Sequence, residues 1–157
     1  MKTLIGLFYR ISEVYHQIFK YPRKSAQIVI KTPKGIILVK PTYASQYYFP
    51  GGGIKMSEKP KQAAIREAKE ELGINLIPIN LKLFGKFTNY RYGWQDNIWL
   101  FTTNCRFPIN PNHKNFEIHH YIFVNSQNFR KYNLSPATRR HLTEYYSVPQ
   151  KHFSKNW

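Results

Sequence analysis

The sequence predicts one mixed α/β domain. Three observations support this prediction: segments of alternating or β-branched residues typical of strands, segments with helical periodicity, and a glycine-rich break at 49–53 in front of one helix. The chain has 157 residues, a usual size for a single domain and enough to bury a hydrophobic core. No internal repeat, low-complexity tract or long linker divides it.

Residues 2–20 are expected to form an amphipathic helix, because apolar side chains recur there at intervals of three and four. We assign this helix to an N-terminal extension, residues 1–24, and the main domain to residues 25–157. Three roles stay open for the helix. It packs against the domain, pairs with a second subunit in a homodimer, or lies on an anionic membrane surface.

The main domain is expected to begin with a hairpin and to alternate between strands and helices. The turn Pro33-Lys34-Gly35 joins its first two strands. Pro60 suits the first turn of the central helix, and Gly73 suits the position after its end. Ser135 is expected to cap the last helix, with Pro136 as its first residue. The expected strands are 26–32, 36–40, 80–88, 97–103 and 117–124, and the two helices are 59–72 and 136–147.

The charge balance is strongly basic, with 24 Lys and Arg against 8 Asp and Glu, a formal net charge of +16. Such a surface attracts phosphorylated metabolites, RNA or anionic lipid, although a generally basic protein would show the same balance. The single cysteine, Cys105, excludes an internal disulfide. No apolar stretch is long enough to span a bilayer and no signal peptide is recognisable, so we expect a cytoplasmic protein without stable membrane insertion.

Half of the eight acidic residues lie between Glu58 and Glu71. Glu67, Glu70 and Glu71 stand at i, i+3 and i+4, which places their carboxylates on one helical face with Cβ atoms about 5–6 Å apart. Glu58 precedes the helix and can fold back toward that face. The repulsion is costly unless a cation compensates it, and oxygen ligands suit Mg²⁺ or Mn²⁺. The alternative is a solvated acidic face paired with neighbouring lysines.

Residues 52–74 resemble the Nudix box, Gly-x5-Glu-x7-Arg-Glu-U-x-Glu-Glu-x-Gly-U, where U is a bulky aliphatic residue. Ala68 is smaller than the usual residue at its U position. A chance match of the seven fixed residues has a probability on the order of 10⁻⁷. The matching positions are Gly52, Glu58, Arg66, Glu67, Glu70, Glu71, Gly73 and Ile74.

The resemblance implies a Nudix-type α/β/α sandwich with a mixed sheet, and a Mg²⁺- or Mn²⁺-dependent hydrolase. Members of this family cleave a phosphoanhydride bond in a nucleoside diphosphate linked to another moiety. Glu67 and Glu70 would be catalytic, with Glu67 binding metal or acting as general base. Arg66 would orient the glutamates rather than contact the substrate. The implied metal ligands are the Gly51 carbonyl, Glu58, Glu67, Glu70 and Glu71.

Many family members use a further acid from outside the box. Glu117 is our first choice, because it precedes the last expected core strand, and Asp96 is the second. An ordinary surface carboxylate is the alternative for either. His119 and His120 are adjacent on an expected strand and face opposite sides, so we do not expect them to share a metal ion.

Substrate recognition is less specified by the sequence. Tyr90, Arg91 and Tyr92 combine aromatic rings with a cation and could stack a base and meet a phosphate, although plain packing would use the same residues. The leading hypothesis is hydrolysis of a small-molecule nucleotide. Two alternatives are an RNA 5′-end pyrophosphohydrolase and a catalytically inactive Nudix domain that senses nucleotide or RNA.

Overall fold

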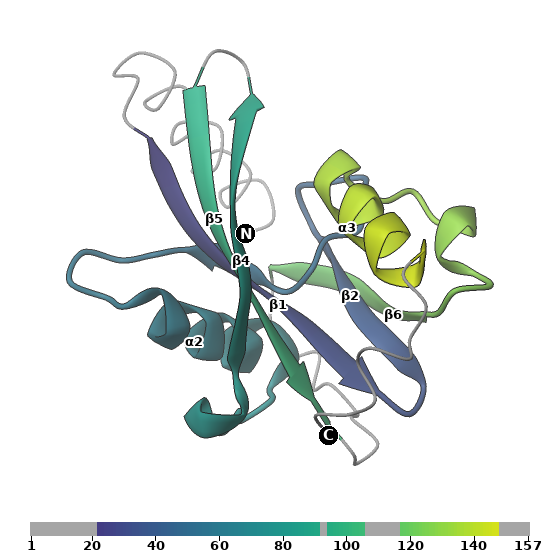
Figure 1. Ribbon diagram of the computed structural model, residues 1–157, viewed down its shortest axis with the longest axis horizontal. Coiled ribbons are helices and arrows are strands. Elements are labelled where there is room, and N and C mark those ends of the chain that lie inside the picture. Colours follow the sequence, from purple (N-terminus) through teal and green to yellow (C-terminus); the bar gives the residue numbers. More distant parts are fainter. Residues whose placement is uncertain (1–21, 92–93, 106–116, 148–157) are drawn as a thin grey trace.

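A computed structural model of the protein describes residues 22–91, 94–105 and 117–147, with two α-helices on a β-sheet (Figure 1). The strands of this part are β1 (Arg23–Thr32), β2 (Gly35–Pro41), β3 (Gly51–Gly53), β4 (Lys82–Arg91), β5 (Trp94–Asn104) and β6 (Ile118–Val124). The helices are α2 (Pro60–Leu72) and α3 (Pro136–Ser147), with 3₁₀ turns η1 (Pro78–Asn80) and η2 (Phe129–Lys131). Each expected strand and helix of the main domain is therefore present.

The sheet is mixed, with strand order β4-β5-β1-β2-β6 and the short β3 paired to β1. β1 runs parallel to β5, from the pair Arg23–Asp96 to the pair Lys31–Asn104, and the other pairings are antiparallel. This confirms the predicted mixed sheet. The sequence did not predict β3, since three consecutive glycines carry no side-chain pattern that indicates a strand.

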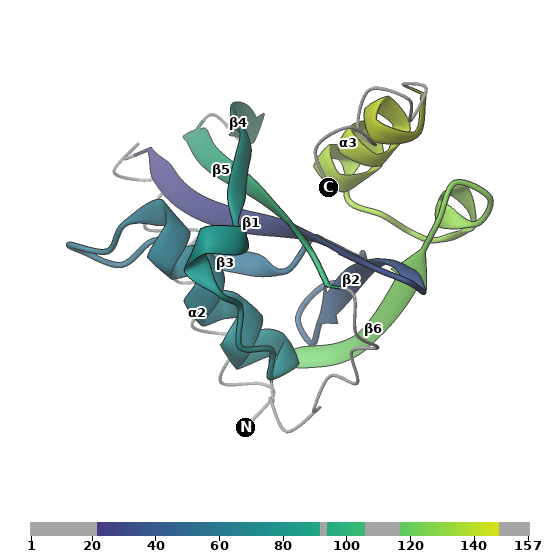
Figure 2. The same ribbon diagram turned by 60° about the horizontal axis from the view of Figure 1, so that its bottom comes forward.

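The two helices cover opposite faces of the sheet (Figure 2). Alternation along β1 divides its side chains: Ala26, Ile28 and Ile30 join the core beneath α2, whereas Val29 joins the core beneath α3. Small residues of α2, Ala63, Ala64 and Ala68, are fully buried against the sheet. The arrangement is the predicted α/β/α sandwich.

The helix ends follow the local signals. Pro60 is the first residue of α2, and Gly73 ends it in the left-handed conformation with φ of 67°. The Ser135 hydroxyl accepts a hydrogen bond from the Thr138 amide at 3.2 Å at the start of α3, as expected of an N-cap. Gly35 has φ of 120° in the β1–β2 turn, where a Cβ would lie 2.4 Å from the Val124 carbonyl oxygen.

The expected helix at 2–20 lies outside the described residues, so its three roles stay predictions. Among the helices that are described, none has the length and apolar character needed to cross a membrane.

Candidate active and metal-binding site

Strand β3 brings the glycine loop against β1 and next to α2. Gly51 pairs with Gln27 and has φ of 147°, and a Cβ at this position would lie 2.2 Å from the Ala26 carbonyl oxygen. Only glycine fits here without moving the backbone. The Gly51 amide donates a hydrogen bond of 2.8 Å to the Glu71 carboxylate. The loop thus holds one acid of the box in place.

Three glutamates of α2 differ in their surroundings although they share one helical side. Glu67 and Glu71 are buried, at 8% and 7% exposure, whereas Glu70 is exposed. The Glu67 carboxylate lies over Gly52, where an added Cβ would be 2.6 Å from its oxygen. Glycine at both positions therefore makes room for, or binds, a buried carboxylate.

Arg66 is the cation at the centre of the acidic cluster. Its Nε donates to Glu58 at 2.9 Å, and its Nη1 donates to Glu67 at 2.6 Å and to Glu70 at 2.9 Å. Its Nη2 donates to Glu58 at 3.1 Å and to the Gly53 carbonyl at 2.9 Å. Glu58 does fold back toward the helix, where its carboxylate also accepts the Lys55 amide at 2.9 Å. One guanidinium thus joins the loop and the helix.

The pKa values reflect these two kinds of environment. Burial raises the pKa of Glu71 well above its usual value, and the charges of Glu67 and Glu117 raise it further against the opposing Gly51 hydrogen bond. Burial also raises the pKa of Glu67, although Arg66 opposes the shift. Hydrogen bonds from Arg66 lower the pKa of Glu58. The buried acids are the stronger proton acceptors.

The structure brings Glu117 into the electrostatic range of the box. It is an exposed residue just before β6, and its charge contributes to the raised pKa values of Glu67 and Glu71. Its carbonyl oxygen accepts the Thr42 amide at 2.7 Å, which attaches this segment to the end of β2. Asp96 lies on β5, where it accepts a hydrogen bond of 3.2 Å from the Ser25 hydroxyl. The first-choice acid is therefore near the cluster.

The other residues singled out in the sequence are the candidate substrate contacts at 90–92 and the two adjacent histidines. Tyr90 and Arg91 belong to the backbone of β4, but their side chains are not described, and Tyr92 is outside the described residues. The His119 and His120 side chains are exposed on β6, and the His120 ring is 3.1 Å from the Tyr47 hydroxyl. The proposed base-stacking segment stays a prediction.

The donor set suits a hard divalent cation, since it consists of carboxylates beside a glycine backbone. In the described residues, no three Asp, Glu, His or Cys side chains are arranged as ligands around one point. Arg66 occupies oxygens of Glu67 and Glu70 instead. A metal ion would therefore fit the chemistry of the cluster once these carboxylates turn partly away from the guanidinium.

A family model described as the NUDIX domain matches residues 21–145. The chain belongs to the Nudix family. The MutT protein from Methanosarcina mazei Go1 has the same fold, with a TM-score of 0.66 and 19% identity over 85% of this chain and 97% of that one. This likeness supports the fold assignment.

Two curated relatives match over shorter segments of the chain. The 8-oxo-dGTP diphosphatase of Escherichia coli (strain K12) is 49% identical over 43 residues, 27% of this chain and 32% of that protein. The RNA pyrophosphohydrolase of Hydrogenovibrio crunogenus is 34% identical over 65 residues, 41% of this chain and 38% of that protein. The chain thus matches only about a third of the length of these relatives.

Sequence reasoning missed one feature of the site, the use of backbone atoms to hold side chains. It assigned Gly51 a metal-binding carbonyl, but the structure also shows its amide bound to Glu71, and it shows the Gly53 carbonyl bound to Arg66. The three-glycine run was the available signal, because close backbone approach favours glycine. Its partners could not be read from it.

Proposed function

We propose that this Nudix protein is a Mg²⁺- or Mn²⁺-dependent hydrolase that cleaves a phosphoanhydride bond in a nucleoside diphosphate linked to another moiety. The observation that carries the proposal is the convergence of Glu58, Glu67 and Glu70 on Arg66, with Glu71 buried beside them. Maintaining so many acids together has a free-energy cost, which a bound cation offsets during the reaction.

Each acid has a distinct part in this proposal. Glu70, Glu71, Glu58 and the Gly51 carbonyl would hold the metal, and Glu117 would supply the acid from outside the box. When bound, the metal would neutralise charge on the pyrophosphate and lower the pKa of a coordinated water. Glu67 would bind metal or accept the proton, and its burial favours the protonated form.

Arg66 fits a positioning role. Its guanidinium contacts Glu58, Glu67 and Glu70 and is about one-fifth exposed, so the glutamates occupy much of its hydrogen-bonding capacity. Tyr90, Arg91 and Tyr92 remain our proposed contacts to the substrate. These residues would contact the base and the phosphate of the substrate.

The test is hydrolysis across a panel of nucleoside triphosphates, ADP-ribose, sugar nucleotides, dinucleoside polyphosphates and 5′-triphosphate RNA, with Mg²⁺ or Mn²⁺. Glu70→Gln should reduce turnover on the order of 10²–10³-fold, because it removes a charge beside the reacting phosphate. Glu144→Gln is the matched control. Glu144 is also exposed on a helix and paired with an arginine four residues away, at 3.0 Å.

Turnover that disappears in Glu70→Gln and persists in Glu144→Gln would support the metal-carboxylate mechanism, and the best substrate would identify the subclass. If no substrate is turned over while nucleotide binding is intact, the enzymatic proposal is wrong and a sensing role takes its place. Chelation of the metal should abolish turnover in the wild type.

A second candidate is removal of a 5′ pyrophosphate from RNA. The net charge of +16 favours a polyanion, and Lys40, Tyr47, His120 and Tyr132 form a basic and aromatic group on the α3 side of the sheet. Aromatic rings beside cations are typical of single-strand binding, and in this group His120 is exposed whereas Tyr47 and Tyr132 are half-buried. RNA turnover should weaken steeply with added salt, whereas mononucleotide turnover should change little.

A further inference from the structure

A cavity of about 460 Å³ lies between α3 and the β4–β5 edge of the sheet. We call it the α3 cavity. Its floor belongs to the core beneath α3, so it opens on the face of the sheet opposite the carboxylates of α2. This volume is within the range of small-molecule sites in proteins. The floor consists of Val29, Ile36, Leu100 and Leu142.

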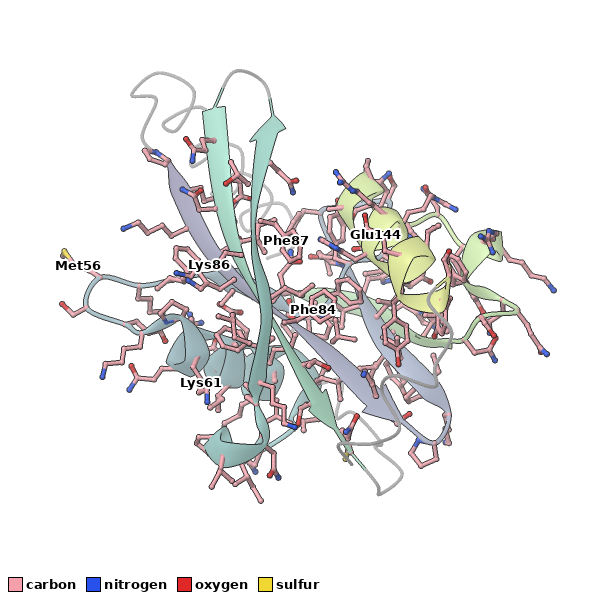
Figure 3. All side chains as sticks on the ribbon, in the orientation of Figure 1. Met56, Lys61, Phe84, Lys86, Phe87 and Glu144 are labelled. Atoms are coloured by element: carbon pink, nitrogen blue, oxygen red, sulfur yellow. The ribbon has the colours of Figure 1, made fainter. Side chains whose placement is uncertain are left out.

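One wall of the α3 cavity is aromatic, because Phe84, His141 and Tyr145 line it, with Phe87 behind the lining. Phe84 stacks with Phe87 at 6.3 Å between ring centroids, and the Phe87 ring meets the edge of His141 on α3 at 4.3 Å. Phe84 and Phe87 both project from β4 on the side that faces α3 (Figure 3). The two rings are three residues apart, so strict alternation would place them on opposite faces of the sheet. An irregularity in the pairing of β4 between Leu83 and Gly85 permits both to lie on one face.

The mouth of the cavity exposes apolar surface. Leu83 and Phe84 both line it, and they are 50% and 46% exposed. When a ligand covers large apolar side chains this accessible beside a concave site, burial of their surface stabilises the complex. The wall and the mouth together therefore suit a flat, partly apolar ligand.

The polar part of the lining is basic. Lys31 and Lys82 line the cavity, and the lining contains no Asp or Glu among the described residues. The Lys31 ammonium lies 4.7 Å from the centroid of the Tyr145 ring, and burial lowers the Lys31 pKa. An anion in the cavity would be attracted by both lysines and would favour the charged form of Lys31.

We propose that the α3 cavity binds a nucleoside monophosphate at a site separate from the carboxylate cluster, with its base against the aromatic wall and its phosphate toward Lys31 and Lys82. Three features of the lining match the face of the base, the phosphate and the edge of the base in such a ligand. The rings of Phe84 and Tyr145 suit a planar base, the lysines suit a phosphate, and the amides of Asn80 and Asn104 can both donate to and accept from a base edge.

The α3 cavity also adjoins the segment that leads to the catalytic loop. Phe49 lines the cavity, and two residues later the Gly51 amide holds Glu71 on the other side of the sheet. A ligand in the cavity would thus contact a segment that continues into the box. The binding proposal itself does not depend on the proposed hydrolysis, because none of its residues belongs to the carboxylate cluster.

The experiment is titration calorimetry of the full chain with AMP and with GMP in EDTA, so that no divalent metal is available to the carboxylates. Lys31→Gln should weaken binding on the order of tenfold, because it removes a charged contact to the phosphate. Lys34→Gln makes the same charge change in the β1–β2 turn outside the cavity lining, and should bind as the wild type does. Asn104→Trp fills the cavity from an exposed position and should abolish binding.

Glu70→Gln should leave this binding unchanged, which separates it from the reaction site. Saturable binding that weakens in Lys31→Gln and Asn104→Trp, but not in Lys34→Gln or Glu70→Gln, would support the proposal. No binding of either nucleotide at millimolar concentration would overturn it, as would equal loss in the two lysine variants. If inorganic phosphate or octanoate binds as tightly as AMP, the cavity recognises anions generally and the nucleotide assignment is wrong.

Discussion

The two faces of the sheet carry side chains of opposite charge, with glutamates on the α2 face and lysines on the α3 face. On the α2 face, small alanines let the helix approach the sheet, and glutamates at its edge reach the glycines of β3. On the α3 face, aromatic residues and lysines surround a cavity. The same strand, β1, supplies both faces by alternation, with Ile30 on one side and Lys31 on the other.

A small number of charged hydrogen bonds holds the acidic face together, and each contributes strongly to stability. The aromatic face is held together by the packing of its rings. The Arg66 guanidinium and two backbone amides, those of Gly51 and Lys55, bind four carboxylates on the α2 face. On the α3 face, the rings of Phe49, Phe87 and His141 lie 4.3–6.5 Å apart in a row. Substitutions should therefore have large, discrete effects on the first face and graded effects on the second.

Gly51→Ala should give the largest effect. The added Cβ would lie 2.2 Å from the Ala26 carbonyl oxygen at a φ of 147°, so β3 must move away from β1. We expect a loss of about 3–5 kcal/mol in the free energy of unfolding, measured by urea denaturation. Gly53→Ala is the control, because a Cβ there meets nothing within 4 Å. Equal stability of the two variants would contradict the role of Gly51.

Arg66→Gln should be the next largest change. It leaves Glu58, Glu67 and Glu70 without their shared cation, at a cost of about 2–3 kcal/mol, less than for a fully buried pair because the cluster is partly exposed. Thermal melting should show that Mg²⁺ stabilises this variant more than the wild type. Arg140→Gln, which removes an exposed pair to Glu144, should change stability by less than about 1 kcal/mol. If Mg²⁺ stabilises Arg66→Gln no more than it stabilises the wild type, Arg66 is not the cation that balances the carboxylates in the metal-free protein.

Glu71→Gln should stabilise the metal-free protein at neutral and higher pH. Because the folded-state pKa of Glu71 is raised, the folded state holds its proton more tightly, and stability falls as pH rises above the unfolded value of about 4.5. The amide cannot ionise, but its oxygen can still accept the Gly51 hydrogen bond. The melting temperatures of Glu71→Gln and the wild type in EDTA should therefore diverge as the pH rises from 5 to 8. Added Mg²⁺ should reduce or reverse the greater stability of the variant. Parallel curves for the two proteins would contradict the raised pKa of Glu71.

Ser135→Ala tests the packing of α3 by removing its N-cap. The Ser135 hydroxyl accepts the Thr138 amide at 3.2 Å and donates to the Thr138 hydroxyl at 2.9 Å. The loss should be about 1 kcal/mol in the free energy of unfolding, with hydrolysis per folded molecule unchanged. Ser147→Ala, at the exposed end of the same helix, should have a smaller effect. A loss of activity in Ser135→Ala would mean that α3 contributes directly to the reaction.

His141 should give the smallest effect, and one of opposite sign to that of Glu71. Burial lowers its pKa below the ordinary value of 6.5, so the unfolded state binds the proton more readily and stability is lost as pH falls through that value. His141→Gln should flatten the dependence of the melting temperature between pH 5 and pH 7. An unchanged slope would show that another group controls stability there.

The sequence by itself determined the elements of the main domain and the content of the acidic helix. The spacing of Glu67, Glu70 and Glu71, the proline at the start of α2 and the glycine after it are local signals, and the structure shows the helix where they predict it. Such signals act over one or two turns of chain, so they can be read without knowing the fold.

Only the tertiary structure decided which groups surround those acids. The bond from Gly51 to Glu71 spans 20 residues, and Glu117 reaches the cluster because β6 pairs with β2. The α3 cavity depends on where β4, β5 and α3 meet. These contacts follow from strand pairing and helix packing between distant segments, and residue spacing along the chain does not specify them.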